Sequence, residues 1–107
     1  MLGKTVTVVV DRPLGSYHPE HKNIYYTVNY GCIPEIIGGD GEGQDAYILG
    51  VDTPIETFTG KVIAIIHREN DVETKWVVAP ENTSFTKKEI LQAVHFQERF
   101  FKIQIET

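Results

Sequence analysis

The sequence is poor in cysteine and in positive charge. Its single cysteine, Cys32, has no partner within the chain for a disulfide bond, so we expect a reducing, cytoplasmic setting. Ten Lys and Arg residues stand against 15 Asp and Glu, which gives a formal net charge of −5. Nucleic-acid binding without sequence preference relies on positively charged faces, so this balance argues against a nucleic-acid partner.

Long apolar runs are also absent. No stretch approaches the roughly 18 residues of a membrane span, and the first residues do not form a charged segment followed by an apolar one. We therefore expect neither a membrane partner nor secretion. The 107 residues suffice for one hydrophobic core, and no linker or repeat interrupts them. The sequence predicts a single domain over residues 1–107.

The chain holds several short segments rich in β-branched and aromatic residues, separated by turn residues. Strands are predicted over residues 5–11, 24–33, 46–51, 61–67 and 75–78. Pro34 is expected to end the second strand, Thr59-Gly60 to form a turn before the fourth, and residues 68–71 to form a turn before the fifth.

The last 22 residues have a different character. Thr86 and Glu89 have the spacing of a capping box, and apolar residues follow at helical intervals. One C-terminal helix is therefore predicted. About five or six short strands without strand–helix alternation favour a mainly β fold, an antiparallel barrel or sandwich with this helix packed against it.

A glycine-rich loop carries the most informative chemistry. Residues 38–43 contain four glycines and lead into Asp45, so that Asp40, Glu42 and Asp45 follow one another closely. Glycine lets the loop bend until all three carboxylates converge, and converging carboxylates repel one another unless a cation lies between them. Hard divalent ions such as Mg²⁺ prefer these oxygen ligands. A solvated acidic turn is the alternative explanation.

A second acidic turn follows. Asp71 and Glu73 bracket it, and Lys75 comes close behind. Two acidic loops and one lysine could together form a site for a divalent ion and a phosphate group, because a bound cation makes a carboxylate-lined site suitable for an anion.

The segments Asn29-Tyr30-Gly31, Asp40-Gly41-Glu42-Gly43-Gln44-Asp45 and Asp71-Val72-Glu73-Thr74-Lys75 resemble the soluble (family I) inorganic pyrophosphatases in order and spacing. That family has an Asp-Gly-Asp-Pro-x-Asp signature that opens a strand after an Asn-Tyr-Gly segment. The resemblance implies a small OB-like five-stranded β-barrel with a C-terminal α-helix. It also implies hydrolysis of inorganic pyrophosphate to two phosphates by a metal-activated water, with Mg²⁺ or Mn²⁺ as cofactor, and a homo-oligomer.

The resemblance also assigns roles to individual residues. The metal ligands that it implies are Asp11, Asp40, Glu42, Asp45, Asp71 and Glu73. The catalytic residues are Asp45, which would orient the attacking water, together with Tyr30 and Lys75. Substrate binding falls to Lys75, Tyr30, Tyr26, Lys22 and Arg12. The alternative explanation for Tyr26 and Tyr30 is that they are core aromatics on one strand face.

The chain departs from the family in its phosphate-binding half. The early hairpin is short, and Phe100 and Phe101 occupy the positions where the family has a Tyr-Lys pair on its C-terminal helix. Two alternatives therefore stay open. One is a divergent member that acts on another phosphoanhydride, and the other is a non-catalytic OB-type module that binds a phosphorylated ligand or a protein.

Overall fold

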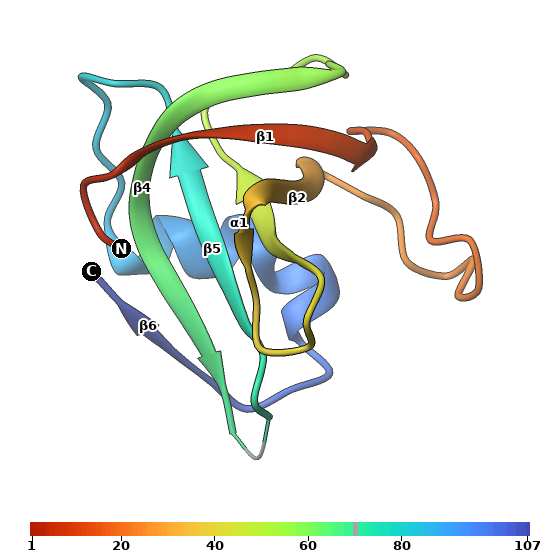
Figure 1. Cartoon of the computed structure of the whole chain (residues 1–107). Coiled ribbons are helices and arrows are strands. Elements are labelled where there is room, and N and C mark those ends of the chain that lie inside the picture. Colours follow the sequence, from red (N-terminus) through yellow and green to blue (C-terminus); the bar gives the residue numbers. More distant parts are fainter. Residues whose placement is uncertain (70) are drawn as a thin grey trace.

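The computed structural model describes residues 1–69 and 71–107 (Figure 1). The elements follow in the order β1 (Thr5–Arg12), β2 (Asn29–Ile37), β3 (Gly43–Ile48), β4 (Thr57–Arg68), β5 (Thr74–Ala79), α1 (Lys87–Glu98) and β6 (Ile103–Glu106). No helix in the described ranges is long and apolar enough to cross a membrane. The predicted mainly β fold with one C-terminal helix is confirmed.

Five strands close into a barrel. Their hydrogen-bonded order is β1-β2-β3-β5-β4, and pairing of β1 with β4 closes the barrel. Strand β6 pairs antiparallel with the C-terminal part of β4, residues 65–68. Helix α1 lies behind strands β4 and β5 in the view of Figure 1. Ile90 and Val94 of α1 pack into a core cluster that also holds Tyr26, Tyr30 and Tyr47. The Thr86–Glu89 capping box is present as predicted.

One strand pair corrects the prediction of an all-antiparallel barrel. Strands β3 and β5 run parallel, with Ala46 opposite Trp76 and Ile48 opposite Val78. The chain can join them without a helix because β4 lies between them in sequence and returns antiparallel to β5. The acidic loop before β3 and the acidic turn before β5 therefore lie at the same end of neighbouring strands.

The predicted strand over residues 24–33 is only partly correct. Residues 24–26 pair with the loop at 15–18 instead of the barrel, through bonds such as Gly15 N–H to the Tyr26 carbonyl, 2.8 Å. Residues 27 and 28 form a bend before β2 begins at Asn29. Strand β2 also continues through Pro34. The register jumps there from Ile33 opposite Gln44 to Ile37 opposite Gly43, and this irregularity accommodates a residue without an N–H.

The structure also differs from the sequence prediction at Gly60 and at residues 103–106. Gly60 lies within β4 and forms no turn, and a side chain there would come within 2.5 Å of the Ala79 carbonyl oxygen. Residues 103–106 form β6 against β4, beyond the helix predicted for this region. The turn predicted over residues 68–71 includes position 70, which lies outside the described residues.

Candidate functional site

The two acidic loops meet at one end of the parallel pair β3–β5. Oxygens of Asp40, Asp45 and Glu73 all lie within 4.8 Å of one another. Gly39 makes this approach possible, because a Cβ atom on it would come within 2.3 Å of the Val72 carbonyl oxygen. Three carboxylates so close together form a donor set of hard oxygens, which suits a divalent ion such as Mg²⁺.

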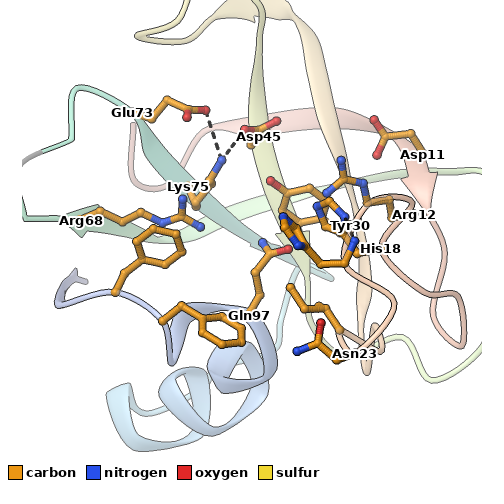
Figure 2. A pocket seen from close by; sticks show the side chains of 14 residues that line it. Asp11, Arg12, His18, Asn23, Tyr30, Asp45, Arg68, Glu73, Lys75 and Gln97 are labelled. Atoms are coloured by element: carbon orange, nitrogen blue, oxygen red, sulfur yellow. Dashed lines mark hydrogen bonds and ion pairs between the residues drawn. The ribbon is translucent and has the colours of Figure 1, made fainter.

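Lys75 lies directly beside this acidic group. Its ammonium donates to Asp45 Oδ2 at 2.5 Å and to Glu73 Oε1 at 3.2 Å, as the dashed lines in Figure 2 mark. Although the side chain is buried, which disfavours its charge, Tyr30 and Asp45 together raise the pKa of Lys75 above its ordinary value. Lys75 is therefore a fixed positive charge at neutral pH.

The pKa of Glu73 is shifted by burial and by the neighbouring carboxylate. Burial, followed by the contact with Asp45, raises the pKa of Glu73, although Lys75 acts in the opposite direction. A cation bound between these carboxylates would favour their ionised forms. The three residues present thus fit a divalent metal ion.

The acidic group opens into a pocket of about 530 Å³. Its cationic lining comes from Arg12, Arg68 and Lys75, and Tyr30 forms part of its wall (Figure 2). The remaining lining residues are Asp11, His18, His21, Asn23, Ile24, Asp45, Glu73, Gln97, Phe100 and Phe101. The pocket therefore combines metal-capable acids with groups able to neutralise an anion.

His18 is one of the side chains that line this pocket. Its Nδ1 accepts the backbone N–H groups of Glu20, at 3.0 Å, and His21, at 3.2 Å. Nδ1 therefore carries no proton, and the neutral ring has its proton on Nε2. Burial, then the charge of Arg12, lowers the pKa of His18, which favours this neutral form.

A chain of hydrogen bonds through the core fixes both pocket arginines. Arg12 donates to the Tyr26 hydroxyl at 2.8 Å, and Tyr26 donates to Gln97 Oε1 at 2.6 Å. Gln97 Nε2 then donates to the Tyr47 hydroxyl at 2.6 Å, and Tyr47 donates to Glu98.

At the end of this chain, Arg68 binds Glu98 through two nitrogens. The side chains of the pair are 8% and 1% exposed. Helix α1 thus holds Arg12 and Arg68 in place through Gln97 and Glu98.

The structure brings together most of the predicted site residues. Asp11, Arg12, Tyr30, Asp45, Glu73 and Lys75 all line the pocket, and Asp40 joins Asp45 and Glu73 in the acidic group. Tyr26 is fully buried behind Arg12 and does not reach the pocket wall. Lys22 does not line this pocket and instead lines a neighbouring hollow with Tyr17, His18 and Pro19.

The two other predicted metal ligands are exposed on the same loops. The backbone N–H of Glu42 donates to Asp40 Oδ1 at 3.0 Å. Asp71 Oδ1 accepts the backbone N–H of Glu73 at 2.9 Å. Asp71 thus shapes its turn with the carboxylate that was expected to hold metal.

Sequence reasoning missed Gln97 and Glu98. Both are buried on α1. The one sequence signal was the position of Glu98, since a carboxylate in the last turn of a helix is unfavourable with the helix dipole unless a partner compensates it.

No family model matches the sequence, and no curated protein matches it. Several solved structures do match. An inorganic pyrophosphatase from Neisseria gonorrhoeae aligns with a TM-score of 0.67 at 19% identity, over 88% of this chain and 72% of the other. One from Ehrlichia chaffeensis aligns with a TM-score of 0.71 at 16% identity, over 97% and 85%.

A third, from Coxiella burnetii, aligns with a TM-score of 0.69 at 16% identity, over 99% of this chain and 86% of the other. The fold resemblance predicted from three short sequence segments is therefore confirmed. The chain has the fold of the soluble inorganic pyrophosphatases.

Proposed function

We propose that the protein hydrolyses inorganic pyrophosphate to two phosphates in a Mg²⁺-dependent reaction. The observation that carries this proposal is the convergence of Asp40, Asp45 and Glu73 beside the buried ammonium of Lys75. The shared fold with solved inorganic pyrophosphatases supports the same reaction class.

Asp40, Asp45 and Glu73 would hold the divalent ion. When bound, such an ion neutralises phosphate oxygens and lowers the pKa of a water molecule toward ~7. Asp45 is the residue to orient that water, because it lies in the acidic group and also lines the pocket.

The cationic and donor groups would bind the phosphates. Lys75 and Arg12 supply positive charge to the phosphate oxygens, with the N–H of His18 Nε2 as a neutral donor. Tyr30 is 5% exposed and lines the pocket, where its hydroxyl can donate to a phosphate oxygen. Burial raises the pKa of Tyr30, so this hydroxyl keeps its proton at neutral pH.

A cytoplasmic location and a homo-oligomer complete the proposal. The single free cysteine suits a reducing compartment, and exposed apolar side chains outside the pocket, such as Leu2 and Ile37, suit a contact between copies.

The test is phosphate release from pyrophosphate by the full chain, with Mg²⁺ and with a chelator. We expect Mg²⁺-dependent release by the wild type and a loss of about 100-fold or more in Asp45→Asn, which removes one charge from the acidic group. Asp52→Asn is the matched control, because Asp52 is exposed and outside the pocket. Absence of metal-dependent release in the folded wild type would refute the proposal.

A further inference from the structure

The pocket is larger than two linked phosphate groups require. Its volume of about 530 Å³ falls within the range of roughly 300–1,000 Å³ found for pockets that enclose drug-sized organic ligands. Pyrophosphate would fill only the part nearest the acidic group. The remaining space is lined partly by the apolar side chains of Ile24, Phe100 and Phe101.

Phe100 and Phe101 are exposed while they line this space. They are 54% and 44% exposed, respectively, directly after α1. Hydrogen bonds from Arg99 N–H to the His95 carbonyl and from Phe101 N–H to the Glu98 carbonyl continue the helical turn and hold this segment. The two rings are therefore presented by ordered backbone instead of being buried in the core.

Arginine side chains support both rings. The Arg68 guanidinium lies 3.8 Å from the centre of the Phe101 ring, and that of Arg99 lies 4.9 Å from the centre of Phe100. Arg68 is itself fixed by its two bonds to Glu98. An aromatic ring that is held in place and still exposed offers a surface on which a planar group can stack.

The pocket thus has two chemically different ends. The acidic group with Lys75 and Arg12 suits a phosphate chain and its metal ion, whereas Phe100 and Phe101 suit a flat ring. We propose, on the basis of the proposed function, that the preferred substrate is an organic phosphoanhydride with a planar ring, of which a nucleoside diphosphate is the simplest form. Its phosphates lie at Lys75, and its ring stacks on Phe100.

The reaction with ADP balances without any further reactant. The water oxygen forms a bond to the terminal phosphorus, and the bond from that phosphorus to the bridging oxygen breaks. The bridging oxygen leaves with the electron pair on AMP, and the water proton is released to solvent. The products are AMP, phosphate and one proton.

The experiment compares ADP with pyrophosphate on the full chain in Mg²⁺, by calorimetric binding and by phosphate release. We expect ADP to bind more tightly and to have the higher kcat/KM in the wild type. Phe100→Ala should lower the ratio of ADP affinity to pyrophosphate affinity by about 5- to 150-fold, the range for loss of one stacked ring. Leu91→Ala is the matched control, since Leu91 is a 43% exposed apolar residue of α1 outside this pocket, and the ratio should stay unchanged.

The outcomes separate this inference from the proposed function. Pyrophosphate hydrolysis without preferred ADP binding, or an affinity ratio that Phe100→Ala leaves unchanged, overturns the inference and leaves the proposed function standing. Phe100-dependent hydrolysis of ADP without hydrolysis of pyrophosphate supports the inference and overturns pyrophosphate as the substrate. Sedimentation of the ligand-free wild type and of Phe100→Ala measures whether the substitution changes the oligomeric state. If Phe100→Ala dissociates an oligomer, a second copy covers the ring and the inference fails.

Discussion

Arg68 donates two hydrogen bonds to the carboxylate of Glu98, at 2.9 Å and 2.6 Å, and both side chains are almost fully buried. The pair joins the end of β4 to the last turn of α1. Burial opposes the charge of Arg68, but the contact with Glu98 outweighs it and raises the pKa of Arg68, so the guanidinium stays charged. The fold therefore depends on Glu98 to balance a charge that supports the pocket.

Glu98→Gln should destabilise the protein by about 3–5 kcal/mol, because it leaves the buried charge of Arg68 without its counter-ion. Urea unfolding measures the loss. Glu106→Gln is the matched control, since Glu106 pairs with His67 at 2.8 Å where both side chains are about half exposed. That variant should lose less than ~1 kcal/mol. Equal losses in the two variants would contradict the importance of burial.

The close approach of Gly39 to Val72 predicts a coupling between the two acidic loops. A methyl group at position 39 would collide with the Val72 carbonyl and force the loops apart, separating Asp40 from Glu73. We expect Gly39→Ala to weaken Mn²⁺ binding by about 10- to 100-fold, as loss of supporting contacts does in other metal sites.

Gly38→Ala serves as the control for this loop. Its added methyl group comes no closer than 3.4 Å to Gln44 Oε1, which is ordinary van der Waals contact, so Mn²⁺ affinity should stay near that of the wild type. The same weakening in both variants would indicate that any substitution loosens the loop and that the contact of Gly39 with Val72 is not specific.

The tautomer of His18 is open to direct measurement. ¹⁵N NMR of the imidazole should show the proton on Nε2, because Nδ1 accepts two backbone N–H groups. Its titration midpoint should lie below the ordinary value of about 6.5 and return toward it in urea-unfolded protein. A proton on Nδ1, or a raised midpoint, would remove His18 as the neutral donor of the pocket.

The thiol of Cys32 gives a pH-dependent reporter near Asp11 and Asp45. Burial, followed by the charges of Asp11 and Asp45, raises the pKa of its thiol. Because only the thiolate reacts, alkylation by iodoacetamide near pH 8 should be slower in the folded protein than in urea. As the pH increases, the alkylation rate of the folded protein should still rise at pH values where the rate of the unfolded chain is already constant. Identical pH profiles for the folded and unfolded protein would contradict a raised pKa of the Cys32 thiol.

Local patterns predicted the elements whose signals lie within a few residues. The capping box at Thr86 located α1, and β-branched runs located the centres of β1, β4 and β5. The start of strand β2 was misplaced because residues 24–26 bond their backbone groups to the loop at 15–18, a pairing that composition does not reveal. The alternating Ile103 and Ile105 of β6 were obscured by the helical pattern before them.

Local sequence patterns likewise predicted some residues of the site but not the contacts that bring them together. Asp40 and Asp45 follow from the glycine-rich loop, and Glu73 with Lys75 from the next turn. Their meeting depends on the parallel pairing of β3 with β5, a contact between segments about 30 residues apart in the chain that no local pattern specifies. The buried chain from Arg12 to Glu98 depends on tertiary contacts as well, and it was not predicted.

The proposed function depends on Asp40, Asp45 and Glu73 forming one divalent-ion site. Calorimetric titration with Mn²⁺, repeated with Mg²⁺, tests it on the wild type, Asp45→Asn and the control Asp52→Asn. We predict binding by the wild type and by Asp52→Asn, and an affinity about 10-fold or more lower in Asp45→Asn, which loses one charged ligand. No binding by the folded wild type, or equal binding by all three proteins, would contradict the account.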